Sequence, residues 1–251
     1  MTISWFCQWD RSKEANPTLD PYDRQALAAL LRGCPGLIEG HVFSPAQAHD
    51  PHYADLGGAP VLVLQLEFAE IVDLENGLQA GGYLFCLADP HFLPSVAGAI
   101  ASHQAMLTRR YPVAEPQPVA ASPEGLLSYL VEYAGPAEDE QAWHRFYVGK
   151  HPHLLSKFPG IRGIEIYTPA VVISGLPFPF RTSMQRNKTV FDSADAMNAA
   201  MLSPVRDALR QDFHSFPPFT GEAAHYPFHT LSVRGGRAKI TFACCASAAL
   251  D

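Results

Sequence analysis

The sequence of 251 residues predicts an α+β fold in which one β-α-β-β-α-β unit occurs twice in tandem. Three observations indicate this fold. Residues 30–45 and 154–169 align without a gap at an offset of 124 residues, with five identical positions. The same offset places the strand-like pattern of residues 4–9 over that of residues 128–133. A proline-rich stretch at residues 112–123 separates two halves of similar length.

The predicted elements follow the same order in each half. In both aligned segments a helix-like pattern ends at a Pro-Gly turn, and a strand-like pattern follows. The first half adds strands at residues 4–9, 61–68 and 105–113 and a helix at 69–79. The second half adds strands at residues 128–133, 183–191 and 226–233 and a helix at 193–212. This order is that of the ferredoxin-like unit.

The proline-rich stretch places the domain boundary near residue 120. This gives an N-terminal repeat at residues 1–120 and a C-terminal repeat at residues 121–251. A ferredoxin-like unit leaves one sheet face uncovered by its own helices, and burying that face stabilises the chain by about 25 cal/mol per Å². We therefore expect the two repeats to pack sheet to sheet as an intramolecular pseudo-dimer. Such a chain can be a monomer, and a further homodimer stays open.

The composition favours a soluble cytoplasmic protein and disfavours nucleic-acid binding. The formal net charge is -7, and no Lys/Arg run is longer than the pair Arg109-Arg110, which argues against nucleic-acid binding. No apolar stretch is long enough to span a membrane, and the N-terminus lacks a signal-peptide pattern. The five cysteines form no C-x-x-C pair, so we expect reduced thiols.

A family resemblance is carried by residues 146–155, FYVGKHPHLL, and by the Pro-Gly turn at 159–160. This segment resembles the EthD-like branch of the dimeric α/β-barrel superfamily, with Tyr147 and His151 at the aromatic and histidine positions. Residues 191–219 are similar to the second helix of that branch. The resemblance implies that the pseudo-dimer is an intramolecular dimeric α/β-barrel. Because the residue at the matching position of the first half is Leu27, it also implies that only the second half is catalytic.

The candidate catalytic residues are His144, Tyr147 and His151, which lie three, four and seven residues apart and so share one helix face. With a pKa near 6.5, an imidazole can take up and return a proton near neutral pH, so we expect His151 to act as the acid/base group. Aromatic and cationic residues near this half are the expected substrate contacts: Tyr129, Tyr133, Trp143, Tyr167, Arg162, Arg181, Phe178 and Phe180.

The resemblance implies a cofactor-independent enzyme that acts on a small aromatic or polyketide-like substrate. Because the sequence offers a proton-transfer residue, we expect a lyase or isomerase of catabolism or secondary metabolism. Three alternatives stay open: a cofactor-free monooxygenase, a haem-dependent one with His151 or His214 as axial ligand, and a non-catalytic ligand-binding barrel. The sequence contains no G-x-G-x-x-G, P-loop, G-x-S-x-G or H-E-x-x-H motif.

Two long connections, at residues 44–60 and 168–182, are expected to cap the pocket. The first contains His49 and His52, which resemble a pair of metal ligands. No third or fourth ligand stands at a recognisable spacing, so we expect no metal site.

Overall fold

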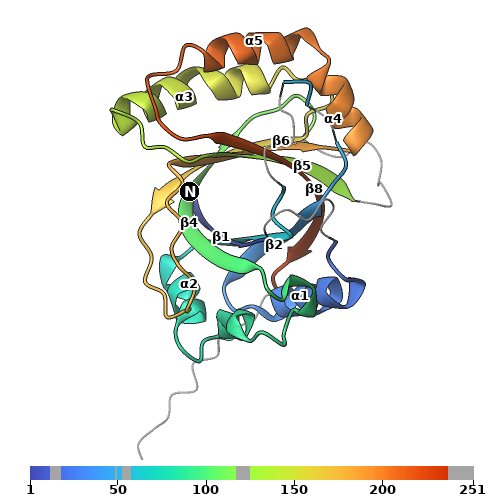
Figure 1. The fold of residues 1–251 in the computed structure, drawn as a ribbon, viewed down its shortest axis with the longest axis vertical. Helices are drawn as coiled ribbons and strands as arrows, with labels where there is room; N and C mark the ends of the chain where they lie inside the picture. The colour runs from blue at the N-terminus through green and yellow to red at the C-terminus, as the bar shows by residue number, and fades with distance from the viewer. Residues whose placement is uncertain (12–17, 49, 53–57, 117–124, 237–251) are drawn as a thin grey trace, which may run out of the picture.

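The computed structural model describes residues 1–11, 18–48, 50–52, 58–116 and 125–236. Its strands pair into a closed antiparallel barrel in the order β1-β3-β2-β8-β5-β7-β6-β4 (Figure 1). The strands are β1 (Thr2–Asp10), β2 (Leu37–Pro45), β3 (Leu62–Phe68), β4 (Ile100–Tyr111), β5 (Leu126–Tyr133), β6 (Gly163–Ala170), β7 (Gln185–Phe191) and β8 (Ala223–Arg234).

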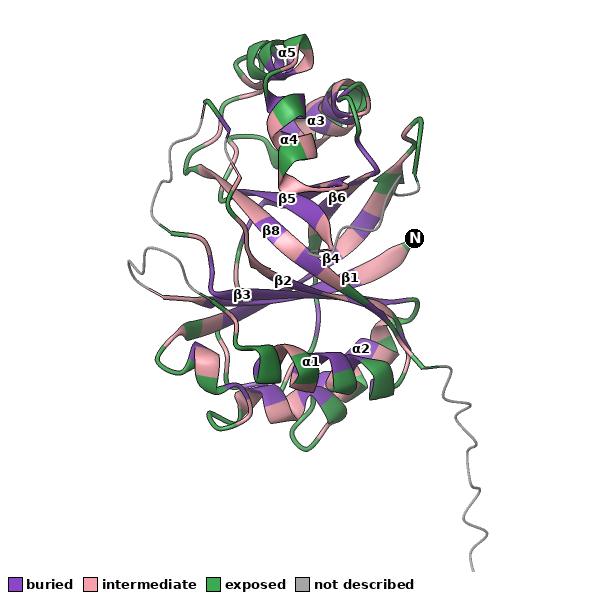
Figure 2. Cartoon of the chain, turned by 90° about the vertical axis from the view of Figure 1, so that its right-hand side faces the viewer, coloured by how far each residue is buried: buried purple, intermediate pink, exposed green. Residues whose placement is uncertain are grey.

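The helices lie outside the barrel in two groups, on opposite sides (Figure 2). Those of the first half are α1 (Pro21–Gly33), α2 (Ile71–Leu78) and the short 3-10 helices η1 (Tyr83–Ala88) and η2 (Pro94–Val96). Those of the second half are α3 (Glu140–Leu155), α4 (Ala194–Met201) and α5 (Pro204–Phe213). No helix of the described residues is long and apolar enough to span a membrane.

The strands of the first half, β1 to β4, face those of the second half, β5 to β8, across the barrel interior. The two sheets are also joined along both edges. Strand β2 pairs with β8, and β4 pairs with β6, both antiparallel. The sequence predicted the packing of one sheet on the other but not these two seams. They arise because twisted sheets bring their edge strands together, where the backbone N–H and C=O groups can pair.

Two expected elements differ in the structure. The single helix expected at residues 193–212 is two helices, because Pro204 starts α5 and cannot continue the hydrogen bonding of α4. The 3-10 helices between α2 and β4 were not predicted. The expected boundary near residue 120 lies outside the described residues. Both Pro-Gly turns are present, with Gly36 at φ 73° and Gly160 at φ 71°.

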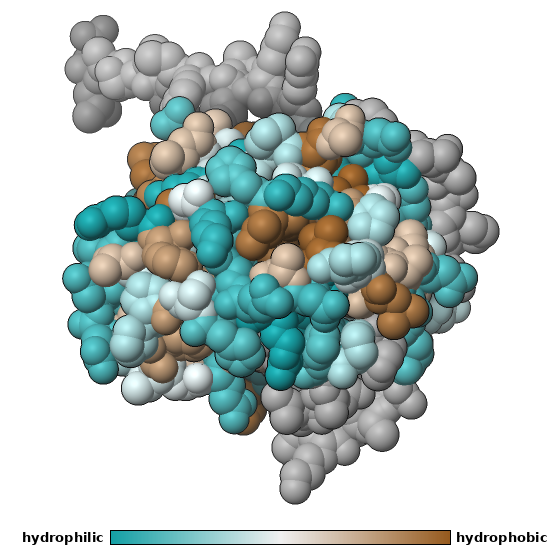
Figure 3. All heavy atoms as spheres, turned by 90° about the horizontal axis from the view of Figure 1, so that it is seen from above, coloured by the Kyte–Doolittle hydropathy of each residue, from teal (hydrophilic) through white to brown (hydrophobic). Residues whose placement is uncertain are grey.

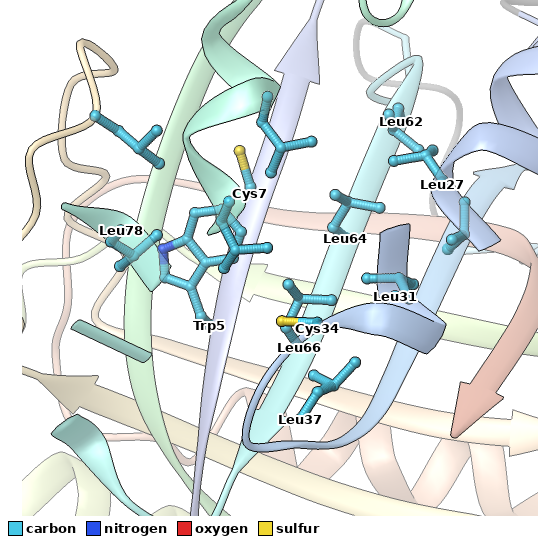
Figure 4. Packing of buried hydrophobic residues seen from close by; sticks show 14 of the residues in the cluster. Trp5, Cys7, Leu27, Leu31, Cys34, Leu37, Leu62, Leu64, Leu66 and Leu78 are labelled. Atoms are coloured by element: carbon cyan, nitrogen blue, oxygen red, sulfur yellow. The ribbon is translucent and has the colours of Figure 1, made fainter. Parts of the chain in front are cut away.

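The core between the helices and the sheet of the first half is mainly apolar. Trp5 from β1, Leu27 and Leu31 from α1 and Leu64 and Leu66 from β3 are all fully buried there (Figure 4). Leu27 stands where the second half has His151. A buried aliphatic side chain at this position has no proton to exchange, so this half contributes packing at the place where its counterpart carries a titratable group.

The long connections cross between the halves. The connection from β2 to β3 places Asp50 against Arg206 of α5. In the opposite direction, the connection from β6 to β7 lies on α2, where the Gly175 N–H donates to the Leu78 carbonyl at 2.9 Å. The Ile173 N–H donates to Glu75 at 3.0 Å. Each half therefore supplies part of the outer layer of the other.

Candidate functional site

The site is built on helix α3, which begins at the N-cap Asp139, whose side chain accepts from the Ala142 N–H at 2.9 Å. Near its other end, His151 Nδ1 lies 2.8 Å from Oδ2 of Asp212, a residue of α5. Lys150 Nζ lies 2.7 Å from the other carboxylate oxygen of Asp212. His151 is 6% exposed and Asp212 is 3% exposed. The pair is thus a buried histidine–carboxylate dyad.

The environment fixes the charge state of this dyad. Burial lowers the pKa of His151, and the hydrogen bond with Asp212 opposes this effect only in part. Burial alone would raise the pKa of Asp212, but the hydrogen bonds with His151 and Lys150 lower it overall. At neutral pH the carboxylate is therefore charged and the imidazole is neutral. Nδ1 carries the proton shared with the carboxylate, which leaves the Nε2 lone pair free to accept one.

A small cavity of about 40 Å³ lies beside His151, between the sheet and helices α3, α4 and α5. Its polar lining comes from Tyr129, His151, Asn187, Thr189, Arg206 and His225, and the rest of its wall is apolar or aromatic. This volume has room for a few water molecules. The outer surface above α3 and α5 is mainly hydrophilic with small apolar groups between (Figure 3).

The first half contributes to this wall through Asp50. Its Oδ2 accepts from the Tyr129 hydroxyl at 2.8 Å and from Arg206 Nη2 at 2.9 Å. Burial would raise the pKa of Asp50, but Arg206 and the hydrogen bonds around it lower it overall. Opposite, burial lowers the pKa of His225 to about 4. The cavity is therefore lined by two neutral imidazoles and one paired arginine.

The expected residues of α3 do not all reach the cavity. Tyr147 is fully buried, lies 4.7 Å from His151 between ring centroids and accepts from the Asn187 side chain. Trp143 stacks on Tyr147 and belongs to the aromatic core, so it packs the helix onto the sheet. His144 Nδ1 lies 3.2 Å from Gln185 Oε1, and the residue is absent from the cavity lining.

Of the expected substrate contacts, Tyr129 and Tyr133 line the cavity with His151. The structure places the others elsewhere. Tyr167 lies on the opposite face of the sheet, inside the barrel against Phe6, because Ile164 and Ile166 take the helix-facing positions of β6.

The remaining expected contacts lie away from the dyad. Arg162, the residue directly before β6 in the chain, forms ion pairs with Asp192 and Glu115. Phe178 packs edge to face against Trp9 of the first half. Phe180 and Arg181 line a different cleft, at the junction of the two halves.

Several residues of the site were missed at the sequence level, among them Asp50, Arg206, Asp212 and His225. One signal was available in α5. Its buried face carries Arg206, Leu209 and Asp212 at intervals of three, so two charged residues occupy a stripe that is normally apolar. Charges on such a stripe indicate a buried polar partner, here His151 and Asp50.

In the conformation described, the cavity is too small for a haem. Ligand sites for drug-sized molecules measure about 300–1,000 Å³, and the cavity beside His151 is several times smaller. His214, the other histidine considered as a haem ligand, is exposed at the end of α5. The described residues contain no group of three or more potential metal ligands. Of the two histidines that resembled a metal-ligand pair, His52 lies 3.8 Å from Asp207. His49 is outside the described residues.

Comparison with known proteins identifies the fold. The chain is similar to an anthrone oxidase-like protein, with a TM-score of 0.56, 13% identity and coverage of 93% of this chain and 92% of that one. A candidate monooxygenase from Fusobacterium nucleatum has a TM-score of 0.56 and 8% identity, with coverage of 94% of each chain. Another candidate monooxygenase, from Lactobacillus acidophilus, has a TM-score of 0.52 and 11% identity, with coverage of 94% of this chain and 97% of that one.

These similarities concern the fold alone, a closed antiparallel barrel with helices on two opposite sides. The sequence matches no protein-family model and no curated protein.

Proposed function

We propose that this protein is an oxidase or monooxygenase that acts on a small aromatic molecule with an acidic C–H bond, and that His151 is its general base. The observation that carries the proposal is the buried hydrogen bond of 2.8 Å between His151 Nδ1 and Asp212 Oδ2. It holds a neutral imidazole with its second nitrogen available to accept a proton. The oxidase and monooxygenase names of structurally similar proteins support this class over a lyase or isomerase.

The chemistry needs a base and dioxygen. His151 Nε2 takes a proton from an activated CH₂ group, and the C–H electron pair stays on the substrate as a carbanion. The carbanion carbon gives one electron to dioxygen and the two radicals combine, which forms a C–O bond. The resulting peroxide anion takes the proton back from the His151 imidazolium and becomes a hydroperoxide. Loss of water then leaves a ketone, so one oxygen atom enters the product and the other leaves in water. Asp212 stabilises the imidazolium that forms in the first step.

The substrate is expected to enter between α5 and the sheet. A ring is too large for a cavity of about 40 Å³, so binding requires α5 to move outwards. The Asp50–Arg206 ion pair ties this helix to the first half, and its exchange for contacts with the substrate would open the site. A guanidinium released in this way can stabilise the enolate oxygen that develops as the proton leaves.

The two halves are best explained as tandem ferredoxin-like repeats of the EthD-like branch. Support comes from the repeated element order and from the matching turns at Gly36 and Gly160. In this account the first half is a scaffold, since Leu27 replaces the histidine, and only the second half is catalytic.

Oxygen uptake with anthrone as the probe substrate tests this function. We expect the wild-type protein to consume oxygen in proportion to the ketone formed, and the His151→Ala variant to lose at least about 100-fold in kcat. The matched control is His153→Ala, an exposed residue on the same helix, which should keep full activity. Full activity of His151→Ala contradicts the role of the dyad. Turnover of an aromatic substrate without oxygen uptake would favour the lyase or isomerase reaction with the same base.

A further inference from the structure

A second cleft lies at the junction of the two halves and has a volume of about 370 Å³. It lies between β4, the end of β6 and the connection that leads to β7. This volume falls within the range of sites that hold small organic ligands, about 300–1,000 Å³. Apolar side chains form most of the wall, including Ala105, Ala170, Val172, Phe180 and Met184.

One polar group in this cleft has an unmet hydrogen-bonding capacity. Gln104 is 6% exposed and lines the cleft from β4. Its Nε2 donates to the Ser183 carbonyl at 2.9 Å, which fixes the orientation of the amide because a carbonyl can only accept. Its Oε1 is buried and has no hydrogen-bond partner among the described residues. A buried carbonyl oxygen without a hydrogen bond destabilises the protein, and a ligand that donates a hydrogen bond to it would remove that cost.

Two charged residues line the cleft, and neither calls for a charged ligand: Glu140 is exposed to water, and Arg181 is already paired. Arg181 Nε lies 2.6 Å from Glu132, and its Nη1 lies 3.0 Å from Asp10, so two carboxylates already neutralise it. The backbone N–H of Arg181 donates to the His103 carbonyl at 2.8 Å, which fixes the loop as well. An anion would gain little here, because the guanidinium is already engaged.

The rim of the cleft exposes apolar surface. Phe180 and Val171 both line the cleft, and they are 55% and 91% exposed. Large apolar side chains left in water at the edge of a cleft are typical of surfaces that cover a bound ligand.

From these features we propose that the cleft is a second small-molecule site, distinct from the cavity of His151. It would take a neutral, largely apolar ring compound with one N–H or O–H group. Because Gln104 Oε1 is itself buried, the amide turns towards the ligand on binding and then accepts its hydrogen bond. The cleft and the cavity of His151 share no lining residue, so the site does not depend on the proposed oxidase activity.

Indole and 1-methylindole form a matched pair of probes, since only indole has the N–H donor. Titration calorimetry with the full chain should show indole binding about three- to tenfold more tightly than 1-methylindole, the contribution of one hydrogen bond. In Gln104→Leu this difference should vanish. Equal affinities in the wild-type protein, or no saturable binding of indole up to millimolar concentrations, overturn the proposal.

Two further variants locate the site. Thr182 is exposed and lines the cleft, so Thr182→Trp should fill it without disturbing the core, and indole binding should be lost. His151→Ala should leave indole binding unchanged. The opposite pattern, with binding kept in Thr182→Trp and lost in His151→Ala, would place the ligand in the other cavity and refute the inference. Circular dichroism of each variant confirms that the fold is intact.

Discussion

Trp5 donates a hydrogen bond from Nε1 to Nδ1 of His103 at 2.9 Å, and their ring centroids lie 5.7 Å apart. The second half repeats the arrangement, with the rings of Tyr129 and His225 also 5.7 Å apart. The strand pairing makes the two histidines equivalent, because each stands opposite the residue two places after the aromatic one. Both halves thus keep an aromatic–histidine pair, while among the described residues only the second half has a histidine–carboxylate dyad on its helix.

Replacing Asp212 by Asn should lower kcat by about 10²- to 10⁴-fold with little change in KM. The asparagine can donate to His151 Nδ1, which puts the proton on Nε2 and removes the base. Steady-state oxygen uptake measures the effect. Lys150→Ala is the control, because Lys150 is 56% exposed at its side chain and contacts only the other oxygen of Asp212. A change in KM with kcat unaffected, or an equal loss of kcat in both variants, would contradict the role of Asp212.

The free energy of unfolding should decrease as the pH falls from about 6.5 towards 4. Burial holds the pKa of His225 at about 4 in the folded protein, against the ordinary value of 6.5. The unfolded state binds more protons in this window, so acid favours it, by up to about 1.4 kcal/mol per pH unit for one histidine. Asp50 opposes the shift, whereas Arg206 and His151 add to it.

Urea unfolding at several pH values tests this prediction. The His225→Gln variant should show a shallower decrease between pH 6.5 and 4, because one of the buried neutral histidines is gone. His103 and His151, whose pKa values are also lowered by burial, keep part of the slope. An unchanged slope in the variant would mean that His225 is not held neutral by the fold.

Replacing Asp50 by Ala should destabilise the protein by about 3–5 kcal/mol, because it removes the carboxylate that neutralises a buried guanidinium. The side chains of Asp50 and Arg206 are 3% and 10% exposed. His52→Ala is the matched control in the same connection. His52 lies 3.8 Å from Asp207, whose side chain is 75% exposed, and such pairs contribute at most about 1 kcal/mol. Chemical denaturation separates the two effects.

The two turn glycines provide a test of packing at equal backbone strain. Both have φ near 70°, so replacing either by alanine should lower the free energy of unfolding by about 1–2 kcal/mol. At Gly36 an added Cβ would also stand 2.6 Å from Asp73 Cβ, whereas at Gly160 no atom lies within 4 Å. Gly36→Ala should therefore lower the melting temperature more than Gly160→Ala. Equal losses would show that the Asp73 contact relaxes freely.

The sequence predicted the order of the strands, both Pro-Gly turns and the position of His151 on a helix of the second half. These features depend on local patterns that recur in the chain. It did not reveal Asp212, which lies 61 residues from His151 and meets it only because α3 and α5 pack together. The equivalence of His103 and His225 was also hidden, since these residues lie 122 positions apart and the repeat was aligned at 124.

The strand β7 shows why part of the site could not be predicted. Its residues QRNKT are polar, which indicates an exposed strand, yet all five are buried. Arg186 and Lys188 point into the barrel and pair with Glu132 and Glu165. Asn187, on the other face, contacts Tyr147 of α3. Only closure of the barrel creates an interior where such residues find partners, and no segment of the sequence carries that information.

The pairing of β2 with β8 and of β4 with β6 also affects how the protein can associate with other chains. An open sheet presents unpaired backbone groups at its edge strands, and these can recruit strands of neighbouring molecules into aggregates. Within the described residues, every strand of this barrel has a partner on both sides. Edge-to-edge polymerisation through these strands therefore requires that the barrel first open.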